Sequence, residues 1–425
     1  MTGTHELALP APAPGAVDRF LRERFRAELA HLRGGRVRCV DALGSYVLGE
    51  NGDGPAIVLD IRDLAFYRHV ATGGSVGAGE AYMEGLWDTS DLVGLVRLLA
   101  RNRDALDALE RGFARFGAAL LRMAHAWRRN TRAGARRNIA AHYDLGNAFF
   151  RLFLDEDMMY SSAVYADDAE TLESASRRKL DLVCRKLALK PSDRVLEIGT
   201  GWGGFAVHAA RHYGCRVTTT TISAEQHAAA AERIVAAGLD DRITLLHEDY
   251  RDLAGRYDKI VSIEMIEAVG AEYLDAYFAT IDALLEPDGR ALIQAITIED
   301  HRYARALGSV DFIKRHVFPG SFIPSIAAML ESKTRSSTLA LVHLEDFGGS
   351  YARTLAAWRE RFLAALPEVA AQGYDARFAR LWDFYLAYCE GGFRERAIGV
   401  AQLVFDKPGV REARRSALAT CANGR

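Results

Sequence analysis

A chain of 425 residues, of which 49% are hydrophobic and 26% charged, has the composition of a folded protein with room for two or three domains. Its 54 basic and 56 acidic side chains leave a formal net charge of −2, which excludes a global field that recruits nucleic acid. The five cysteines are not spaced as metal ligands are. No apolar run reaches the roughly 20 residues that a membrane-spanning helix needs. The first residues also lack the basic start and apolar stretch of an export signal. We therefore expect a cytoplasmic protein that is neither exported nor membrane-spanning and that binds no metal.

The first part of the chain predicts a small mixed α/β domain. Residues 1–16 are rich in alanine, proline and glycine, which is typical of a flexible tail. Hydrophobic periodicity then predicts both helices and short strands. The expected elements are a helix over 17–32, strands within 36–50 and 56–71, and a helix from Gly79 through 102. We assign this lipid or interaction domain to residues 17–120.

Between residues 101 and 138 the sequence predicts a basic amphipathic connector. This segment carries ten Lys or Arg against three Asp or Glu, and its apolar residues recur at helical spacing. Such an excess of positive charge favours contact with anionic lipid headgroups, although half of the segment can equally pack between domains. The arginines expected at the lipid surface are Arg128, Arg129, Arg132, Arg136 and Arg137. Residues 121–135 are assigned as a basic linker.

From residue 136 the pattern changes to alternating strands and helices. The expected helices cover 171–189, 204–214, 224–238 and 272–289, and the expected strands cover 194–200, 216–223, 243–249, 257–266 and 290–298. Repeated βα units predict a parallel, doubly wound, Rossmann-like sheet with ligands at the carboxyl ends of its strands. This domain is assigned to residues 136–410, and a C-terminal tail to 411–425.

The stretch VLEIGTGWGGFA, residues 195–206, marks the expected ligand site. Gly199, Gly201 and Gly204 fit GxGxxG between a strand and a helix, which suits either a dinucleotide or S-adenosylmethionine. A dinucleotide site usually has an acidic residue about 20 residues on, but the second strand ends in TTTTIS without a carboxylate. Glu197 instead precedes the glycines, where it can reach a cationic or amino-bearing ligand. The sequence therefore favours S-adenosylmethionine, while a purely structural role for Glu197 stays open.

Several motifs in order resemble the cyclopropane-fatty-acyl-phospholipid synthase family. They are HYDLGNAFFRLFLDEDMMYSSAVY (142–165), VLEIGTGWGG, TISAEQ, EDYRDL, YDKIVSIEMIEAVG, FIKRHVFPGSFIPS (312–325), YARTLAAWRERF and FRERAIGVAQLVFDKP, preceded by GAGEAYMEGLWDTSDLVGLVRLLARN (77–102). The resemblance implies a class I methyltransferase fold and transfer of a methyl group from S-adenosylmethionine to a double bond in a phospholipid acyl chain, with cyclopropane formation as the leading expectation. It also implies a homodimer at the inner face of the membrane.

The same resemblance assigns residues to the cofactor, position by position. Tyr160 and Ser161 would line its methionine end, Gly199 and Gly201 would approach it through their backbone, Thr221 and Gln226 would bind the ribose, and Tyr250 would flank the adenine. For the two tyrosines the alternative is a plain core aromatic. Aromatic faces can also stabilise the carbocation that methyl transfer creates. The candidates for that role are Tyr165, Tyr303, Phe318 and Tyr351.

In the family, the base that completes the reaction is a bicarbonate ion held by a cysteine, a glutamate, a histidine, an isoleucine backbone and a tyrosine. Here Glu267, Ile296 and Tyr351 match, but Ser162 stands at the cysteine position and Gln294 at the histidine position. Serine and glutamine can still donate hydrogen bonds to an anion, so bicarbonate binding stays open. Three alternatives to cyclopropane synthesis stay open. They are an enzyme with a methyl-branched or methylene product, a lipid-binding protein without catalysis, and a dinucleotide oxidoreductase.

Overall fold

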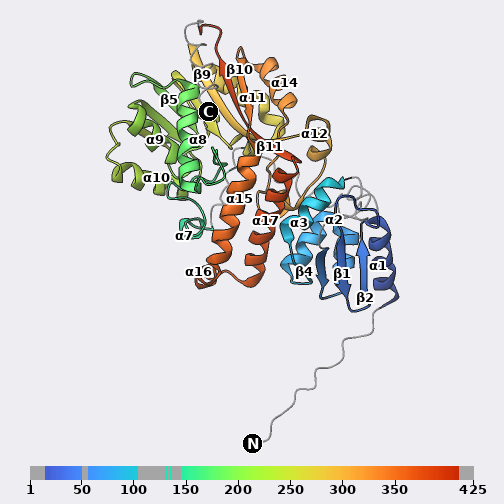
Figure 1. Ribbon diagram of the computed structural model, residues 1–425. Helices are drawn as coiled ribbons and strands as arrows, with labels where there is room; N and C mark the ends of the chain where they lie inside the picture. Colours follow the sequence, from blue (N-terminus) through green and yellow to red (C-terminus); the bar gives the residue numbers. More distant parts are fainter. Residues whose placement is uncertain (1–14, 50–55, 104–130, 132–133, 136–144, 411–425) are drawn as a thin grey trace, which may run out of the picture. The chain divides into compact units, whose positions relative to one another are not determined.

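The computed structural model describes residues 15–49, 56–103, 131, 134–135 and 145–410 (Figure 1). The chain divides into two compact units, Met1–Gly117 and Ala118–Arg425, and each is described by itself. The tails predicted at both ends lie almost entirely outside the described residues. So do most of the basic connector and all five of the arginines expected at the lipid surface.

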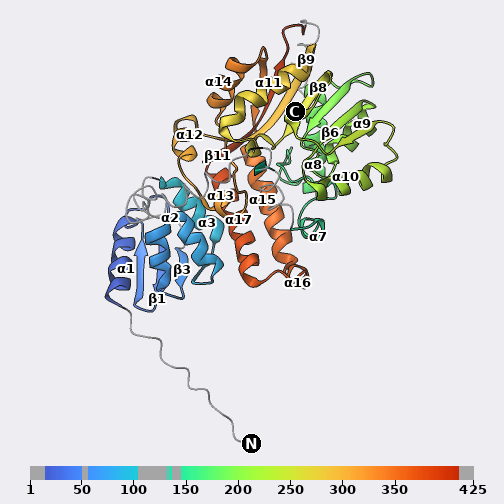
Figure 2. The ribbon, with the colours of Figure 1, turned by 180° about the vertical axis from the view of Figure 1, so that it is seen from behind.

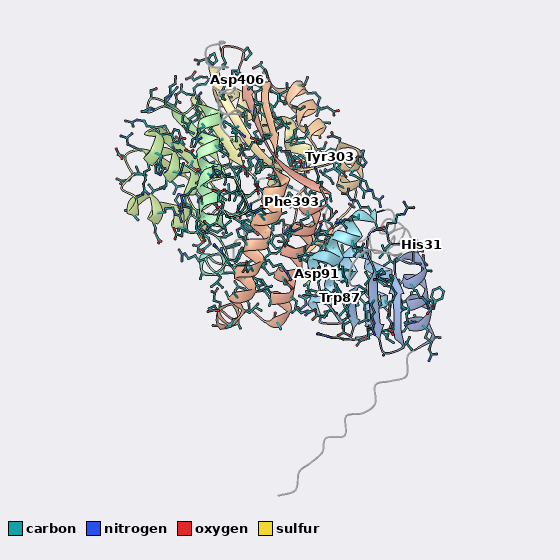
Figure 3. The ribbon with its side chains drawn as sticks, in the orientation of Figure 1. His31, Trp87, Asp91, Tyr303, Phe393 and Asp406 are labelled. Carbon is teal, nitrogen blue, oxygen red and sulfur yellow. The ribbon has the colours of Figure 1, made fainter. Side chains whose placement is uncertain are left out.

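The first unit is a mixed α/β domain, as predicted, with a four-stranded sheet in the order β2-β1-β3-β4. Its elements are α1 (Ala16–Glu28), β1 (Val37–Asp41), β2 (Gly44–Leu48), β3 (Ile57–Ile61), α2 (Ala65–Met83), β4 (Trp87–Thr89) and α3 (Leu92–Arg101). Strand β3 pairs parallel to β1, whereas β2 and β4 pair antiparallel to their neighbours. Trp87 lies in the core of this unit, and Asp91 caps the amino end of α3 (Figure 3).

Two predictions for the first unit are wrong. The segment 56–71 is a strand only in its first half, because the Asp63 carboxylate accepts a hydrogen bond from the backbone N–H of Ala65 and starts α2 there. The helix expected from Gly79 is interrupted, since Gly85 with φ of 74° follows α2 and the chain then forms β4 against β3.

The second unit is built on a seven-stranded sheet in the order β10-β11-β9-β8-β5-β6-β7. Its strands are β5 (Arg194–Ile198), β6 (Arg216–Thr220), β7 (Ile243–Leu246), β8 (Tyr257–Ile263), β9 (Leu285–Ile298), β10 (Ala340–Asp346) and β11 (Ile398–Asp406). Its helices are α7 (Asn147–Phe150), α8 (Leu172–Leu187), α9 (Gly204–Tyr213), α10 (Ala224–Ala236), α11 (Leu274–Leu284), α12 (Asp300–Leu307), α13 (Phe312–His316), α14 (Ile326–Ser336), α15 (Gly348–Ala364), α16 (Leu366–Ala371) and α17 (Ala376–Arg394).

Helices cover both faces of this sheet, as the doubly wound prediction requires (Figures 1 and 2). Alternating strand residues explain the two layers, because neighbours along a strand point to opposite faces. Leu196 and Ile293 pack with α11 and α14, whereas Val195 and Leu292 pack with α8, α9 and α10. The buried strands therefore carry apolar side chains on both faces.

The sheet departs from the all-parallel prediction at β11, which pairs antiparallel to both β9 and β10. The cause is the connection from β10 to β11. A single helix between two strands returns the chain to the end where the first strand began, so the next strand runs parallel. Here α15 and α17 lie side by side as a helical hairpin joined by α16, which returns the chain to the carboxyl end of β10 (Figure 1). The next strand must then run in reverse.

Candidate functional site

The glycine turn after β5 forms one side of the site. Gly199 and Gly201 have φ of 102° and 53°, in the left-handed region that favours glycine. Gly204 is required for space, because a Cβ there would lie 2.5 Å from the Met159 sulfur. The N–H groups of Gly199 and Thr200 donate to the Thr220 carbonyl, which ties the turn to the end of β6. A Cβ on Gly201 would meet nothing within 4 Å, so the turn leaves room beside its backbone.

Glu197, at the end of β5, has a structural partner. The Thr219 hydroxyl donates to its carboxylate at 2.6 Å, and Thr219 shares a second hydrogen bond of 2.7 Å with Thr200. Burial raises the pKa of Glu197 to about 8, against the opposing effects of Thr219 and Lys179. The role as an acceptor that joins β5 to β6 is therefore present, and contact with a ligand stays a prediction.

Three residues predicted for the ribose and adenine lie at the ends of β6 and β7, along the same sheet edge. The Thr221 hydroxyl donates to the Gln226 side-chain carbonyl at 3.1 Å, and both side chains are buried. Ser223 caps α10 and thereby places Gln226 in its first turn. The Tyr250 hydroxyl is buried and has no partner among the described residues, and burial raises its pKa to about 12. A buried hydroxyl without a partner marks a place where a ligand can supply one.

The loop from Asp155 to Ala163 carries Tyr160 and Ser161 into the site. Asp155 is buried and accepts hydrogen bonds from the N–H of residue 157 and the hydroxyl of Ser176, which fixes the start of the loop. The ammonium group of the buried Lys179 donates to the Ser161 hydroxyl at 2.8 Å, and burial lowers the pKa of Lys179 to about 8. The Tyr160 hydroxyl bonds that of Tyr385 at 2.9 Å. The two predicted methionine-end residues are thus each held by a hydrogen bond, Ser161 by a buried lysine and Tyr160 by a tyrosine of α17.

A carboxylate that the sequence analysis did not select, Glu264, lies at the centre of the site. Its Oε1 accepts hydrogen bonds from the backbone N–H of Ser162 at 2.9 Å and from the Gln294 amide at 2.8 Å. Its Oε2 accepts one from the Tyr351 hydroxyl at 2.8 Å. The Ser162 hydroxyl turns away and donates to the carbonyl of Ala163. Three of the five groups predicted to hold bicarbonate therefore hold Glu264.

The other two groups of the predicted bicarbonate site bind each other. The Ile296 N–H donates to Oε1 of Glu267 at 2.6 Å, while Oε2 of Glu267 is buried without a partner among the described residues. Burial raises the pKa of Glu267 to about 8, and the nearby charge of Glu264 adds to the effect. Two carboxyl groups, neither of which forms an ion pair with another described residue, thus lie near each other.

A buried polar chain continues from Glu264 across β9 and β11, along the face of the sheet that α8 covers. The Gln294 carbonyl oxygen accepts from the Gln402 amide at 2.9 Å, and the Gln402 carbonyl oxygen accepts from the Lys186 ammonium at 2.7 Å. Lys186 also pairs with Glu345, whose side chain is half exposed. We call Lys186, Gln402 and Gln294 the polar relay.

The aromatic candidates for cation stabilisation are differently placed. The guanidinium of Arg353 lies 3.9 Å from the ring centroid of Tyr165, so one face of that ring already carries a cation. The Tyr351 ring packs against the ring of Phe393 on α17, with 4.4 Å between the ring centroids; Figure 3 labels Phe393. The ring centroids of Phe318 and Tyr160 lie 6.2 Å apart, and Tyr303 lies on α12. Phe318 and Tyr351 are therefore beside the predicted site residues.

The sheet with one reversed strand, and the glycine turn at its carboxyl edge, define a Rossmann-like, S-adenosylmethionine-dependent class I methyltransferase. The mycolic acid cyclopropane synthase CmaA1, solved in complex with SAH and CTAB, has this fold, with 30% identity, a TM-score of 0.60, and coverage of 64% of this chain and 98% of that one. Coclaurine N-methyltransferase, at 20% identity and a TM-score of 0.60, shares the fold alone.

The family follows from the sequence matches. The mycolic acid cyclopropane synthetase family model matches residues 130–403, and the chain belongs to this family. It is 40% identical over 359 residues to the cyclopropane-fatty-acyl-phospholipid synthase of Escherichia coli, covering 84% of this chain and 89% of the relative. It is 38% identical over 355 residues to the tuberculostearic acid methyltransferase UfaA1 of Mycobacterium tuberculosis, covering 82% of each. The prediction of S-adenosylmethionine over a dinucleotide is confirmed.

Within residues 15–49, 56–103 and 145–410, no helix is both long and apolar enough to cross a membrane. In the same part of the chain, no three His, Cys, Asp or Glu side chains are grouped so that they could hold a metal ion.

Proposed function

We propose that this methyltransferase transfers a methyl group from S-adenosylmethionine to the double bond of an unsaturated acyl chain on a membrane phospholipid, and that the product is a cyclopropane. The substrate class is that named for the E. coli relative. The observation that carries the proposal is the charge of the site. Buried or half-buried carboxyl groups of Asp155, Glu197, Glu264 and Glu267 accompany one buried cation, Lys179.

This surplus of acidic groups suits the chemistry. S-adenosylmethionine supplies a positively charged sulfonium, and methyl transfer to an alkene moves that positive charge onto the acyl chain. Negative charge held in place by hydrogen-bond donors, as on Glu264, stabilises both states more than bulk water does. An alkene is a weak nucleophile, so holding it against the methyl group is the other large contribution. The aromatic side chains of Tyr160, Phe318 and Trp358, which pack together, provide apolar surface beside the site.

A methyl-branched or methylene product is the second candidate. The relative UfaA1 is named for tuberculostearic acid. In addition, Glu264 lies among the groups predicted to hold the bicarbonate ion that serves ring closure. A proton acceptor in a different place would remove a different proton and give a different product.

Purified protein incubated with S-adenosylmethionine and dioleoyl phospholipid vesicles distinguishes these functions. We expect release of S-adenosylhomocysteine and a gain of one CH2 per modified chain by mass spectrometry. Cyclopropane proton signals in the NMR spectrum of the lipid support the first product, and vinylidene signals support the second. No S-adenosylhomocysteine with any unsaturated vesicle would overturn acyl-chain methylation.

We propose further that the enzyme works as a homodimer on the inner face of the membrane and binds anionic lipid through the basic connector. The support is the net excess of seven positive charges over residues 101–138. Replacing Arg128, Arg129, Arg132, Arg136 and Arg137 with glutamine is expected to weaken sedimentation with anionic vesicles. Unchanged sedimentation would remove this part of the proposal, and light scattering of the purified protein tests the dimer.

A further inference from the structure

We infer that Glu264 is a catalytic residue of this enzyme, and that its carboxylate, rather than a bound bicarbonate ion, accepts the proton released after methyl transfer. This inference rests on the proposed methyl transfer. The groups that resemblance assigns to bicarbonate do not fit a second anion, because the Ser162 N–H, Gln294 and Tyr351 already bind Glu264 and the Ile296 N–H binds Glu267. A bicarbonate ion added beside them would also meet two carboxyl groups of its own charge.

The hydrogen bonds fit a carboxylate that stays ionised. Three donors converge on the two oxygens of Glu264, whereas Glu267 accepts one hydrogen bond and leaves its Oε2 without a partner among the described residues. Burial raises the pKa of both groups, but donors stabilise the charged form, so Glu267, which has fewer donors, is the one that holds a proton more readily. Glu264 is then the member of the pair that can act as a base.

The polar relay fixes the orientation of the amide group that faces Glu264. A lysine ammonium group can only donate, so the Gln402 amide must turn its oxygen toward Lys186 and its NH2 toward Gln294. The Gln294 amide must then turn its own oxygen toward Gln402 and its NH2 toward Glu264. A cation on α8, two side chains away along the same face of the sheet, therefore fixes a donor against the carboxylate.

The backbone conformation of Glu264 is a further, independent indication that its side chain has a functional role. Its φ is 49°, in the left-handed region, directly after β8 ends at Ile263. A residue with a side chain is strained there by about 1 kcal/mol or more, and glycine is not. The chain carries this strain at a position where glycine would fit and where the only evident gain is the carboxylate itself. Residue 264 as a whole is half-buried.

The step balances without another reactant. As the methyl group transfers, its bond to sulfur breaks with the electron pair left on sulfur, and the alkene π electrons form the new carbon–carbon bond. The adjacent carbon becomes a cation. The Glu264 carboxylate then removes a proton from the new methyl group, and the electron pair of that C–H bond closes a three-membered ring onto the cation. If a hydride first moves from the methyl-bearing carbon to the cation, loss of the same methyl proton instead forms the double bond of a methylene product. The protonated Glu264 returns its proton to solvent before the next turnover.

Glu264→Gln and Glu264→Gly test the inference in the full-length enzyme, with dioleoyl phospholipid vesicles in buffer freed of carbon dioxide and in buffer with added bicarbonate. The glycine variant relieves the left-handed backbone, so it is expected to fold, and thermal melting checks this. Glu286→Gln is the matched control, because it is a half-buried glutamate of the same sheet at the opposite edge.

We expect wild-type product formation to be independent of bicarbonate and both Glu264 variants to lose about 100-fold or more, the usual contribution of a general base. Bicarbonate should restore part of the activity to Glu264→Gly, whose Ser162, Gln294 and Tyr351 donors are then unoccupied, but not to Glu264→Gln, whose amide fills the space. A wild-type requirement for bicarbonate, or a Glu264→Gln enzyme within threefold of wild type, would overturn the inference alone. Absence of S-adenosylhomocysteine from the wild-type reaction would overturn the proposed function with it.

Discussion

Two buried polar positions on the same pair of strands, β9 and β11, are built on opposite principles. Arg290 and Asp406 face each other across the strands in a bidentate ion pair with distances of 2.6 and 3.0 Å, and both are buried (Figure 3 labels Asp406). Four residues along, Gln294 and Gln402 face each other as neutral amides and lead to Glu264, which forms no ion pair among the described residues.

The difference separates stability from function. A buried charge with a close opposite charge has its desolvation offset and serves the fold. A buried carboxylate held only by neutral donors keeps its negative charge available to a ligand, at a cost to folding. One strand pair therefore holds, four residues apart, a structural site and a chemical one, and substitutions at each should have opposite consequences.

The largest expected effect is on the free energy of unfolding, when the ion pair between Arg290 and Asp406 is broken. Asp406→Ala leaves Arg290 buried without its partner and is expected to destabilise the second unit by about 3–5 kcal/mol. Urea unfolding followed by tryptophan fluorescence measures this. Arg335→Ala, which breaks an exposed pair with Asp275, is the control and should cost no more than about 1 kcal/mol. Equal losses in the two variants would contradict the distinction between buried and exposed pairs.

Beside Glu264, Glu267→Gln is expected to stabilise the protein by an amount that depends on pH. Glu267 ionises near pH 4.5 when unfolded and near pH 8 when folded, so the wild type loses stability as pH rises between these values. Glutamine cannot ionise, and the variant should be more stable by about 1–3 kcal/mol at pH 8 and equal near pH 4.5. Urea midpoints across this range test it, with the exposed Glu331→Gln as the control. A constant difference at every pH would show that ionisation is not the cause.

The fold was largely predictable because its signals are local. Hydrophobic alternation predicted β5 through β9, and the glycines at 199 and 201 marked the turn after β5, where positive φ favours glycine. The reversal of β11 was not predictable, since it depends on α15 and α17 folding back on each other rather than on anything in the β11 sequence. A helical hairpin and one long helix have the same periodicity.

The site was only partly predictable for a related reason. The segment EMIEAVG offers two glutamates three residues apart, and the sequence gives no ground to prefer Glu264 as the one that binds Ser162, Gln294 and Tyr351. Its selection depends on a left-handed φ after β8, which is a property of the folded chain. Lys186 was missed because a lysine in the last turn of a helix usually serves that helix end.

The polar relay gives a smaller expected effect. Lys186→Met removes the cation that orients both amides, so Gln294 can turn its oxygen toward Glu264 and disfavour the charged carboxylate. We expect about tenfold slower product formation, with the acidic limb of the pH–rate profile moved to higher pH. Glu345→Gln leaves Lys186 in place and is the control. A slower enzyme with an unchanged pH profile would indicate that Lys186 matters for packing alone.

The smallest expected effect concerns the cofactor side. The Tyr250 hydroxyl is buried without a partner among the described residues, so Tyr250→Phe removes no hydrogen bond seen in the fold and should leave the melting temperature unchanged or slightly raised. If the bound cofactor supplies the partner, the KM for S-adenosylmethionine rises about threefold with kcat unchanged, which corresponds to one modest hydrogen bond. Tyr257→Phe, whose hydroxyl is exposed near the amino end of β8, is the control. A higher melting temperature with an unchanged KM would instead make Tyr250 a core aromatic, the alternative that its sequence position left open.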